Sequence, residues 1–145
     1  MVKIICVTGS VGTGKTRFAE NLAKKKNYKY LNLTDFVKKN KLTEYYDRKR
    51  KTYDIDIKKL NKALIKYIKD SKENLIIDGH LSHYLPKKYV DLCCVCKTDL
   101  KKLKKRLERR KYNKLKIQEN LECEIFDVCL NEARELKHKI KIIYT

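Results

Sequence analysis

The residue pattern with the clearest chemistry lies near the start of the chain, at residues 9–16. These residues read Gly-Ser-Val-Gly-Thr-Gly-Lys-Thr, which matches the GxxxxGK[ST] phosphate-binding loop in full. Its glycines allow positive φ and bring backbone N–H groups close to phosphate oxygens. Lys15 is then placed to contact the β and γ phosphates of a nucleotide, and the Thr16 hydroxyl to hold Mg²⁺. The alternative is a glycine-rich turn before a helix, which the complete Lys15-Thr16 pair argues against.

A second metal-binding carboxylate is expected beside such a loop, and residues 74–78 supply it. Asp78 ends the run Asn-Leu-Ile-Ile-Asp, so its carboxylate is expected at the carboxyl edge of a parallel sheet, next to the loop. We expect Asp78 to hold Mg²⁺ directly or through water, the alternative being a turn cap because Gly79 follows. His80 is a candidate for orienting an attacking water or group. The alternative for His80 is an exposed loop histidine.

Basic residues gather where one predicted helix ends and the next begins: Arg106, Arg109, Arg110 and Lys111. In a lid, their forked guanidinium groups would neutralise the charge on a transferring phosphoryl group. The alternative is an ordinary solvated helix end. A second basic segment, 45–53, alternates with tyrosines. It fits a segment that closes over a second nucleotide, and equally a nucleic-acid contact with aromatics among basic side chains.

Length and composition limit the classes of protein that the chain can be. Its 145 residues fit one domain, and 42% hydrophobic residues are enough to form a core. The formal net charge of +19 makes binding to polyanions favourable and excludes a strongly acidic partner mimic. No apolar run approaches the ~20 residues that cross a bilayer, and the start lacks signal-peptide architecture. We therefore expect a soluble, cytoplasmic protein without a membrane partner.

The six cysteines predict buried thiols rather than a metal site. Cys93 and Cys96 have CxxC spacing but lie in a predicted strand, where residues three apart point to opposite faces. Cys123 and Cys129 are six apart on a predicted helix, which is also poor ligand spacing. Small apolar thiols are commonly buried, and we expect that role here.

Apolar periodicity predicts strands alternating with helices, and hence a parallel sheet covered on both faces. The expected strands are 2–7, 29–33, 74–78, 90–96 and 139–145. Helices are expected at 15–26, from Thr34 or Asp35 to 39, from an Asp56 cap onward, from Thr98 or Asp99 through 107, and at about 114–137. Residues 40–54 show weak periodicity and predict a mobile surface segment, and residues 79–88 predict a loop. The fold class is therefore an α/β three-layer P-loop sandwich with five parallel strands.

Nearly the whole chain, in order, resembles the adenylate kinase isoenzyme 6 family. The Walker A match is generic, whereas the pair Asp78 and His80 and two later blocks are more specific: ERRKYN and ENLECEIFDVCLNEA. The resemblance implies a small P-loop nucleoside monophosphate kinase of the adenylate kinase type, with ATPase activity and a link to maturation of the small (30S) ribosomal subunit. It implies ATP and Mg²⁺ as cofactors and AMP or another monophosphate as substrate. We expect a monomer whose partners include small-subunit ribosomal protein eleven and rRNA.

The resemblance also implies site residues within a single kinase domain spanning residues 1–145. The nucleotide-binding loop falls on Gly12, Thr13, Gly14, Lys15, Thr16 and Arg17, the lid arginine on Arg110, and the Walker B aspartate and paired histidine on Asp78 and His80. Lys15, Arg110, Asp78 and His80 form the expected catalytic set, and Thr16 and Asp78 the expected magnesium ligands. The acceptor-nucleotide region falls on about 31–54 and the short lid on about 108–118.

Two departures from the family pattern affect these expectations. Lys38 stands where relatives carry an acceptor-region arginine, and it would contact a monophosphate as a point charge rather than a fork. Relatives also continue beyond the fifth strand with a base-binding loop and a final helix, whereas this chain ends at Thr145. We therefore expect truncation to affect the adenine-side contacts and one sheet-covering helix.

The alternative function is an assembly ATPase acting on ribosomal precursors with little monophosphate kinase activity. A plain RNA-binding module is disfavoured by the complete set of Lys15, Thr16 and Asp78.

Overall fold

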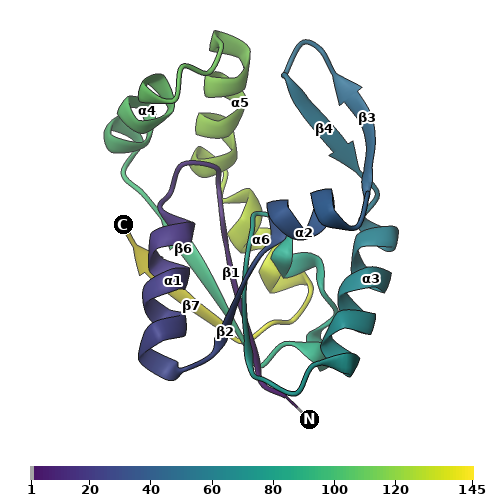
Figure 1. The fold of residues 1–145 in the computed structure, drawn as a ribbon. Helices are drawn as coiled ribbons and strands as arrows, with labels where there is room; N and C mark the ends of the chain where they lie inside the picture. Colours follow the sequence, from purple (N-terminus) through teal and green to yellow (C-terminus); the bar gives the residue numbers. More distant parts are fainter. Residues whose placement is uncertain (1) are drawn as a thin grey trace.

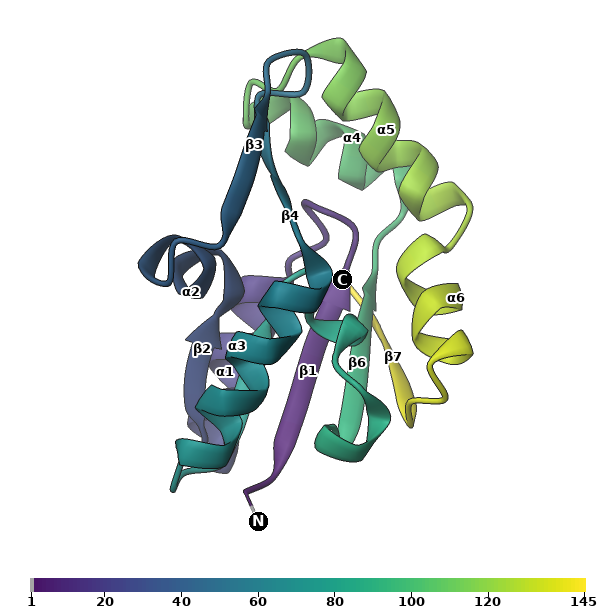
Figure 2. The ribbon, with the colours of Figure 1, turned by 90° about the vertical axis from the view of Figure 1, so that its right-hand side faces the viewer.

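The computed structural model describes residues 2–145, whose central feature is a five-stranded parallel sheet (Figures 1 and 2). The strands are β1 (Ile4–Gly9), β2 (Lys29–Asn32), β5 (Leu75–Asp78), β6 (Leu92–Lys97) and β7 (Ile140–Tyr144), in the spatial order β2-β5-β1-β6-β7. All four neighbouring pairs are parallel. The central strands β5, β1 and β6 are continuous apolar runs, because both of their faces are covered. This confirms the predicted α/β fold class.

Helices cover the two faces of the sheet and form the outer layers of a sandwich (Figure 2). On one face, α1 (Lys15–Lys26) buries Ala19 and Ala23 in a cluster with residues of β1, β5 and β6. On the other face lie α3 (Ile57–Asp70) and α6 (Val128–Glu135). Asp56 caps α3 as predicted, and its side chain accepts hydrogen bonds from the N–H groups of the first turn. Fully buried leucines such as Leu60 and Leu64 each stabilise the fold by about 1.5–3 kcal/mol.

Three further elements rise beyond the carboxyl edge of the sheet (Figure 1). They are α4 (Leu100–Arg109), α5 (Lys114–Ile125) and a hairpin of β3 (Thr43–Asp47) and β4 (Thr52–Ile55). The segment at 40–54 lies mostly exposed at the surface as predicted, but it contains two antiparallel strands that its weak periodicity did not predict. Tyr46 lies opposite Tyr53 in that register, and their rings pack edge to face at 4.9 Å between centroids. Such aromatic cross-strand pairs stabilise a hairpin without a long apolar pattern.

The start of α2 (Leu33–Lys39) differs from the sequence prediction, whereas α4 begins at one of its two predicted caps. α2 is capped by Asn32, whose side chain accepts a hydrogen bond from the Asp35 N–H, so neither Thr34 nor Asp35 is the cap. Asp99 caps α4, whereas the Thr98 N–H donates to Glu124. The segment predicted as a loop at 79–88 contains two short 3₁₀ turns, Ser82–Tyr84 and Lys87–Tyr89.

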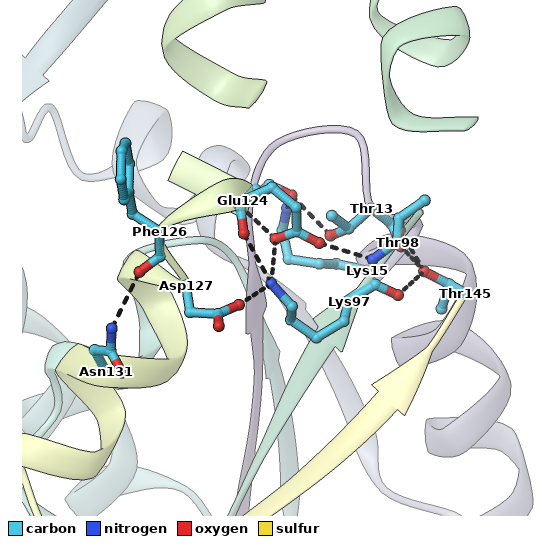
Figure 3. A network of polar contacts seen from close by, with 10 residues as sticks. Thr13, Lys15, Lys97, Thr98, Glu124, Phe126, Asp127, Asn131 and Thr145 are labelled. Atoms are coloured by element: carbon cyan, nitrogen blue, oxygen red, sulfur yellow. Dashed lines mark hydrogen bonds and ion pairs between the residues drawn. The ribbon is translucent and has the colours of Figure 1, made fainter. Parts of the chain in front are cut away.

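The single long helix predicted at 114–137 is wrong, because the chain breaks between α5 and α6. Asp127 adopts a left-handed conformation with φ of 51°. Its carboxylate pairs with Lys97 at the end of β6, and Lys97 also pairs with Glu124 at 3.0 Å (Figure 3). These ionic contacts hold the break in place. Consequently the stripe that was predicted to point inward is interrupted, and Ile125 and Val128 are exposed.

The cysteine side chains follow the strand geometry. Cys93 packs in the core beneath α3 and α6, whereas Cys96 packs in the core beneath α1. They therefore face opposite sides of the sheet, as the alternation predicted. Within residues 2–145 all six cysteines are free thiols. Among these residues no helix has the length and apolar character needed to cross a membrane.

Candidate active site

The phosphate-binding motif forms the loop between β1 and α1, at the carboxyl edge of the sheet. Gly12 and Gly14 have φ of 91° and 80°, a region that side chains strain to reach. A Cβ atom on Gly12 would lie 3.0 Å from Leu107 and 3.1 Å from Leu103, so α4 packs directly on the loop. The loop therefore curls tightly enough for its N–H groups to cradle an anion.

The start of α1 adds to this anion site. Gly14 is the N-cap and provides no side chain to accept hydrogen bonds from the first turn. Lys15 opens the helix, and its Nζ atom lies 3.0 Å from the carbonyl oxygen of Ser10. Burial lowers the pKa of Lys15, an effect that the carboxylate of Asp78 opposes. A helix N-terminus and a lysine thus converge at one point, an arrangement that attracts phosphate.

A buried carboxylate that sequence reasoning missed supports the loop from behind. Glu124 of α5 is 5% exposed, and one of its oxygens accepts a hydrogen bond from the Ser10 hydroxyl at 3.0 Å. Its other oxygen accepts from the Thr98 N–H at 2.7 Å (Figure 3). The sequence signal was its spacing: Glu124 follows Ile117 by seven residues, which places both on the same face of α5. Glu124 therefore ties α5 and β6 to the phosphate-binding loop.

Asp78 lies beside this loop, as the strand order requires. It pairs in register with Val7 of β1 and is 3% exposed. The Tyr30 hydroxyl donates to its Oδ2 atom at 2.5 Å. Sequence reasoning did not single out Tyr30, because its partner is 48 residues away in the chain. Burial of Asp78 at the carboxyl edge is the placement predicted from the apolar run before it.

His80 lines the same cavity as Lys15 and Asp78. His80 is nevertheless exposed to solvent, as the alternative reading of this loop histidine predicted. Desolvation by neighbouring protein atoms, followed by the nearby charge of Lys15, lowers the pKa of His80 to about 4. The imidazole is therefore neutral at physiological pH, so it can accept one hydrogen bond and donate another.

One cavity of about 940 Å³ holds most of the predicted site residues. Its lining includes Gly12, Gly14, Lys15, Thr16, Arg17, Asp78, His80 and Arg110. Six cationic and three acidic side chains line it, a net charge of +3 that suits polyphosphate. Another cavity, of about 460 Å³, lies between α2 and α3 and contains none of the predicted site residues.

Several predicted residues lie elsewhere. The Thr13 side chain is buried and donates to the carbonyl oxygen of Ser10 at 2.7 Å, so it shapes the loop. Arg106 donates to the carbonyl oxygen of Gly12 at 3.2 Å without lining the cavity. Lys38 is exposed on α2 and also lies outside the lining. Of the basic cluster after α4, only Arg110 faces the cavity.

Similarity to known proteins agrees with this geometry. A family model described as an AAA domain matches residues 5–127. The adenylate kinase isoenzyme 6 homolog of Schizosaccharomyces pombe is 41% identical over 133 residues, which cover 90% of this chain and 74% of that protein. This chain belongs to the adenylate kinase isoenzyme 6 family.

Other relatives extend the comparison. A protein of Methanocaldococcus jannaschii named a putative adenylate kinase is 37% identical, covering 94% of this chain and 75% of that protein. A solved structure of shikimate kinase from Acinetobacter baumannii in complex with shikimate superposes with a TM-score of 0.65 at 14% identity, covering 97% of this chain and 83% of that one. That superposition shows a shared P-loop fold alone. Family and fold make this member of the adenylate kinase isoenzyme 6 family a P-loop enzyme of the nucleoside monophosphate kinase type.

The side chains of this family member fit a magnesium ion in the cavity. The Thr16 hydroxyl and the Asp78 carboxylate both line it, and Mg²⁺ prefers such hard oxygen ligands. Among residues 2–145, only Tyr30 donates to Asp78, and the Oδ1 atom accepts no hydrogen bond. Those residues contain no cluster of three His, Cys, Asp or Glu side chains suited to enclose a metal. One or two protein ligands, with the rest from phosphate and water, are typical of Mg²⁺ in nucleotide sites.

Proposed function

We propose that the protein is a broad-specificity nucleoside monophosphate kinase that transfers the terminal phosphate of ATP to AMP or another monophosphate. The observation that carries this proposal is the gathering of Lys15, Asp78 and Arg110 around one cationic cavity. The acceptor-nucleotide region at about 31–54 supplies further lining residues, Asn32, Thr34, Arg50 and Thr52. The cavity volume lies in the upper part of the range of ordinary ligand sites, about 300–1,000 Å³.

The chemistry proposed for this site is positioning and charge stabilisation. The loop N–H groups and Lys15 bind the β and γ phosphates, and Arg110 on the short lid neutralises charge that develops on the transferring group. Thr16 and Asp78 hold Mg²⁺, which neutralises charge on the phosphate oxygens when bound. An acceptor monophosphate is already ionised, so its attack needs no general base.

The second candidate activity is acceptor-independent ATP hydrolysis, and the position of His80 favours it. A neutral imidazole beside the phosphate-binding loop can orient a water, whereas monophosphate transfer gives it no evident task. His80→Ala should therefore lower hydrolysis more than transfer. Equal losses in both activities would assign His80 a shared or structural role.

A role in maturation of the small ribosomal subunit is the wider part of the proposal. The supporting observation is the exposed basic face of α4, which carries Lys101, Lys102, Lys104 and Lys105. Such a face binds RNA phosphates, and its affinity falls as salt rises. Small-subunit ribosomal protein eleven and rRNA are the proposed partners, and the cytoplasm is the proposed site of action.

A panel of turnover assays tests the proposal. ATP consumption is measured alone and with each of AMP, CMP and dAMP, and the products are separated. A kinase forms diphosphate from both nucleotides at a rate that depends on the monophosphate. Phosphate release that no monophosphate changes would instead support the assembly ATPase.

A further inference from the structure

Tyr30 is a half-buried side chain that links Asp78 and Asn32, two residues of the cavity wall. It lies on β2 opposite Ile76 of β5 and packs against the core beneath α1. From there its hydroxyl reaches the Oδ2 atom of Asp78 at 2.5 Å. A tyrosine hydroxyl is protonated at neutral pH, so this group donates its hydrogen to the carboxylate.

The hydrogen bonds continue from Tyr30 to the first turn of α2. The Asn32 side-chain amide donates to the Tyr30 oxygen at 3.2 Å. The Asn32 carbonyl oxygen accepts from the Asp35 N–H at 3.1 Å. Because the Asp35 N–H can only donate, it fixes the Asn32 carbonyl on its own side and leaves the amide N–H for Tyr30. Each group donates toward Asp78, so the bonds form one directed chain in which neighbours strengthen each other.

The two ends of this series of hydrogen bonds lie at different parts of the cavity wall. Asp78 stands beside the phosphate-binding loop, and its unoccupied Oδ1 atom is the one that can face a metal or its bound water. Asn32 and Thr34 line the cavity where α2 begins. Under the proposed function, α2 belongs to the acceptor region. A shift of its first turn when an acceptor binds would move Asn32 and hence Tyr30.

We propose that Tyr30 is a positioning residue that couples the acceptor side of the cavity to Asp78 through Asn32. It holds Oδ2 so that the carboxylate presents Oδ1, and it does so best when α2 is held by an acceptor. Through this coupling, MgATP adopts the arrangement needed for phosphoryl transfer only when an acceptor is bound. Without an acceptor, ATP is therefore protected from hydrolysis. This inference rests on the proposed function for the identity of the acceptor.

The test is Tyr30→Phe, which keeps the packed ring and removes only the hydroxyl. Tyr28→Phe is the matched control, since Tyr28 packs against the same core and its hydroxyl makes no hydrogen bond within residues 2–145. Asn32→Ser is the second variant, because serine retains the α2 cap but is too short to reach Tyr30. Thermal melting of each variant confirms that it is folded.

The first readout is equilibrium binding, which needs no turnover. Calorimetry measures the dissociation constant of a non-hydrolysable ATP analogue with Mg²⁺, with and without saturating AMP. In the unaltered protein we expect AMP to tighten binding at least about fivefold, the lower end of ordinary coupling between sites. Tyr30→Phe and Asn32→Ser should remove most of that factor, and Tyr28→Phe should keep it. Coupling that is absent from the unaltered protein, or unchanged in Tyr30→Phe, overturns the proposal.

The second readout separates coupling from a purely structural role. We expect Tyr30→Phe to lower kcat for transfer to AMP about tenfold, with KM for ATP and acceptor-independent hydrolysis within about twofold. Equal losses of transfer and hydrolysis would mean that Tyr30 merely supports Asp78, and would overturn the coupling. If no monophosphate accepts phosphate from the unaltered protein, the proposed function fails instead, whatever the binding data show.

Discussion

Arg50 and Glu119 join the β3–β4 hairpin to α5 through a two-point ion pair across the cavity that both residues line. The Nε and Nη2 atoms of Arg50 each lie 2.8 Å from one carboxylate oxygen of Glu119. Asp47 orders the hairpin tip by accepting a further hydrogen bond from Arg50 at 2.8 Å. The Asn113 amide also donates to the carbonyl oxygen of Lys49 at 3.0 Å. The β3–β4 hairpin and the start of α5 therefore meet beside the cavity.

This contact is weak enough to open during exchange of substrates. The side chains of Arg50 and Glu119 are 45% and 36% exposed, so solvent screens the pair and its contribution to stability is small. We expect Glu119→Gln to raise the ratio of acceptor-independent hydrolysis to transfer about threefold, because water reaches the γ-phosphate more often. Product analysis of both reactions measures the ratio. Glu44→Gln, which breaks the Lys59–Glu44 pair outside the cavity, should leave it unchanged, and an unchanged ratio in Glu119→Gln would refute the sealing role.

Lys15→Ala should lower phosphoryl transfer by about 10²-fold or more, because the β and γ phosphates lose their point charge. Steady-state kinetics and circular dichroism together show whether activity falls while the fold remains. Lys25 is exposed on the same helix and lies outside the cavity lining, so Lys25→Ala is the control. Near-normal transfer by Lys15→Ala would remove the loop from the mechanism.

Arg110→Ala should lower kcat more than it raises KM for ATP, since its charge is needed most while the phosphoryl group moves. The neighbouring Arg109→Ala removes the same charge from an exposed position that does not line the cavity. It should leave kcat within about twofold. The comparison fails for our account if both arginines behave alike.

Glu124→Ala should reduce the free energy of unfolding by about 3–5 kcal/mol, because Lys97 loses a buried partner and the Ser10 and Thr98 contacts are lost. Urea unfolding measures this loss. Glu122→Ala, exposed on the same helix, should cost less than about 0.5 kcal/mol. If Glu124→Ala lost no more stability than Glu122→Ala, the supporting role of the Glu124 carboxylate would be contradicted.

Stability should fall as the pH is lowered from 7.5 to 5.5, in part because of His83. Burial lowers the pKa of His83, although Glu132, 3.1 Å from its Nε2 atom, acts in the opposite direction. Below pH ~6.5, His83 therefore binds a proton more readily in the unfolded chain than in the folded chain. Each such group lowers the free energy of unfolding by at most about 1.4 kcal/mol per pH unit. His83→Gln should flatten the pH dependence of thermal melting. His80 acts in the same direction in both proteins, so the difference between them isolates His83. An identical slope would show that His83 titrates normally.

The sequence predicted the sheet and the loop because both depend on local patterns. Apolar runs bounded by glycine or Asp78 indicate buried strands, and the loop motif carries its own geometry. The break at Asp127 and the hairpin depend on distant partners, namely Lys97 for the break and a paired tyrosine across the strands. No periodicity over 114–137 or 40–54 contains that information.

The same limit applies to the site. Lys15, Asp78 and Arg110 were predicted because motif and resemblance name them, and all three line the cavity. Tyr30 and Glu124 were missed because their hydrogen bonds span 48 and 114 positions of the chain. Only the packed structure shows that Tyr30 contacts Asp78 and that Glu124 contacts the phosphate-binding loop.

The fate of a labelled γ-phosphate tests the central claim most directly. The protein is incubated with γ-labelled ATP, Mg²⁺ and AMP, and the products are separated by chromatography. We predict that most of the label appears in ADP, at a rate that rises with AMP and is lost in Asp78→Ala. Label released as inorganic phosphate at a rate independent of every monophosphate tested would contradict kinase function.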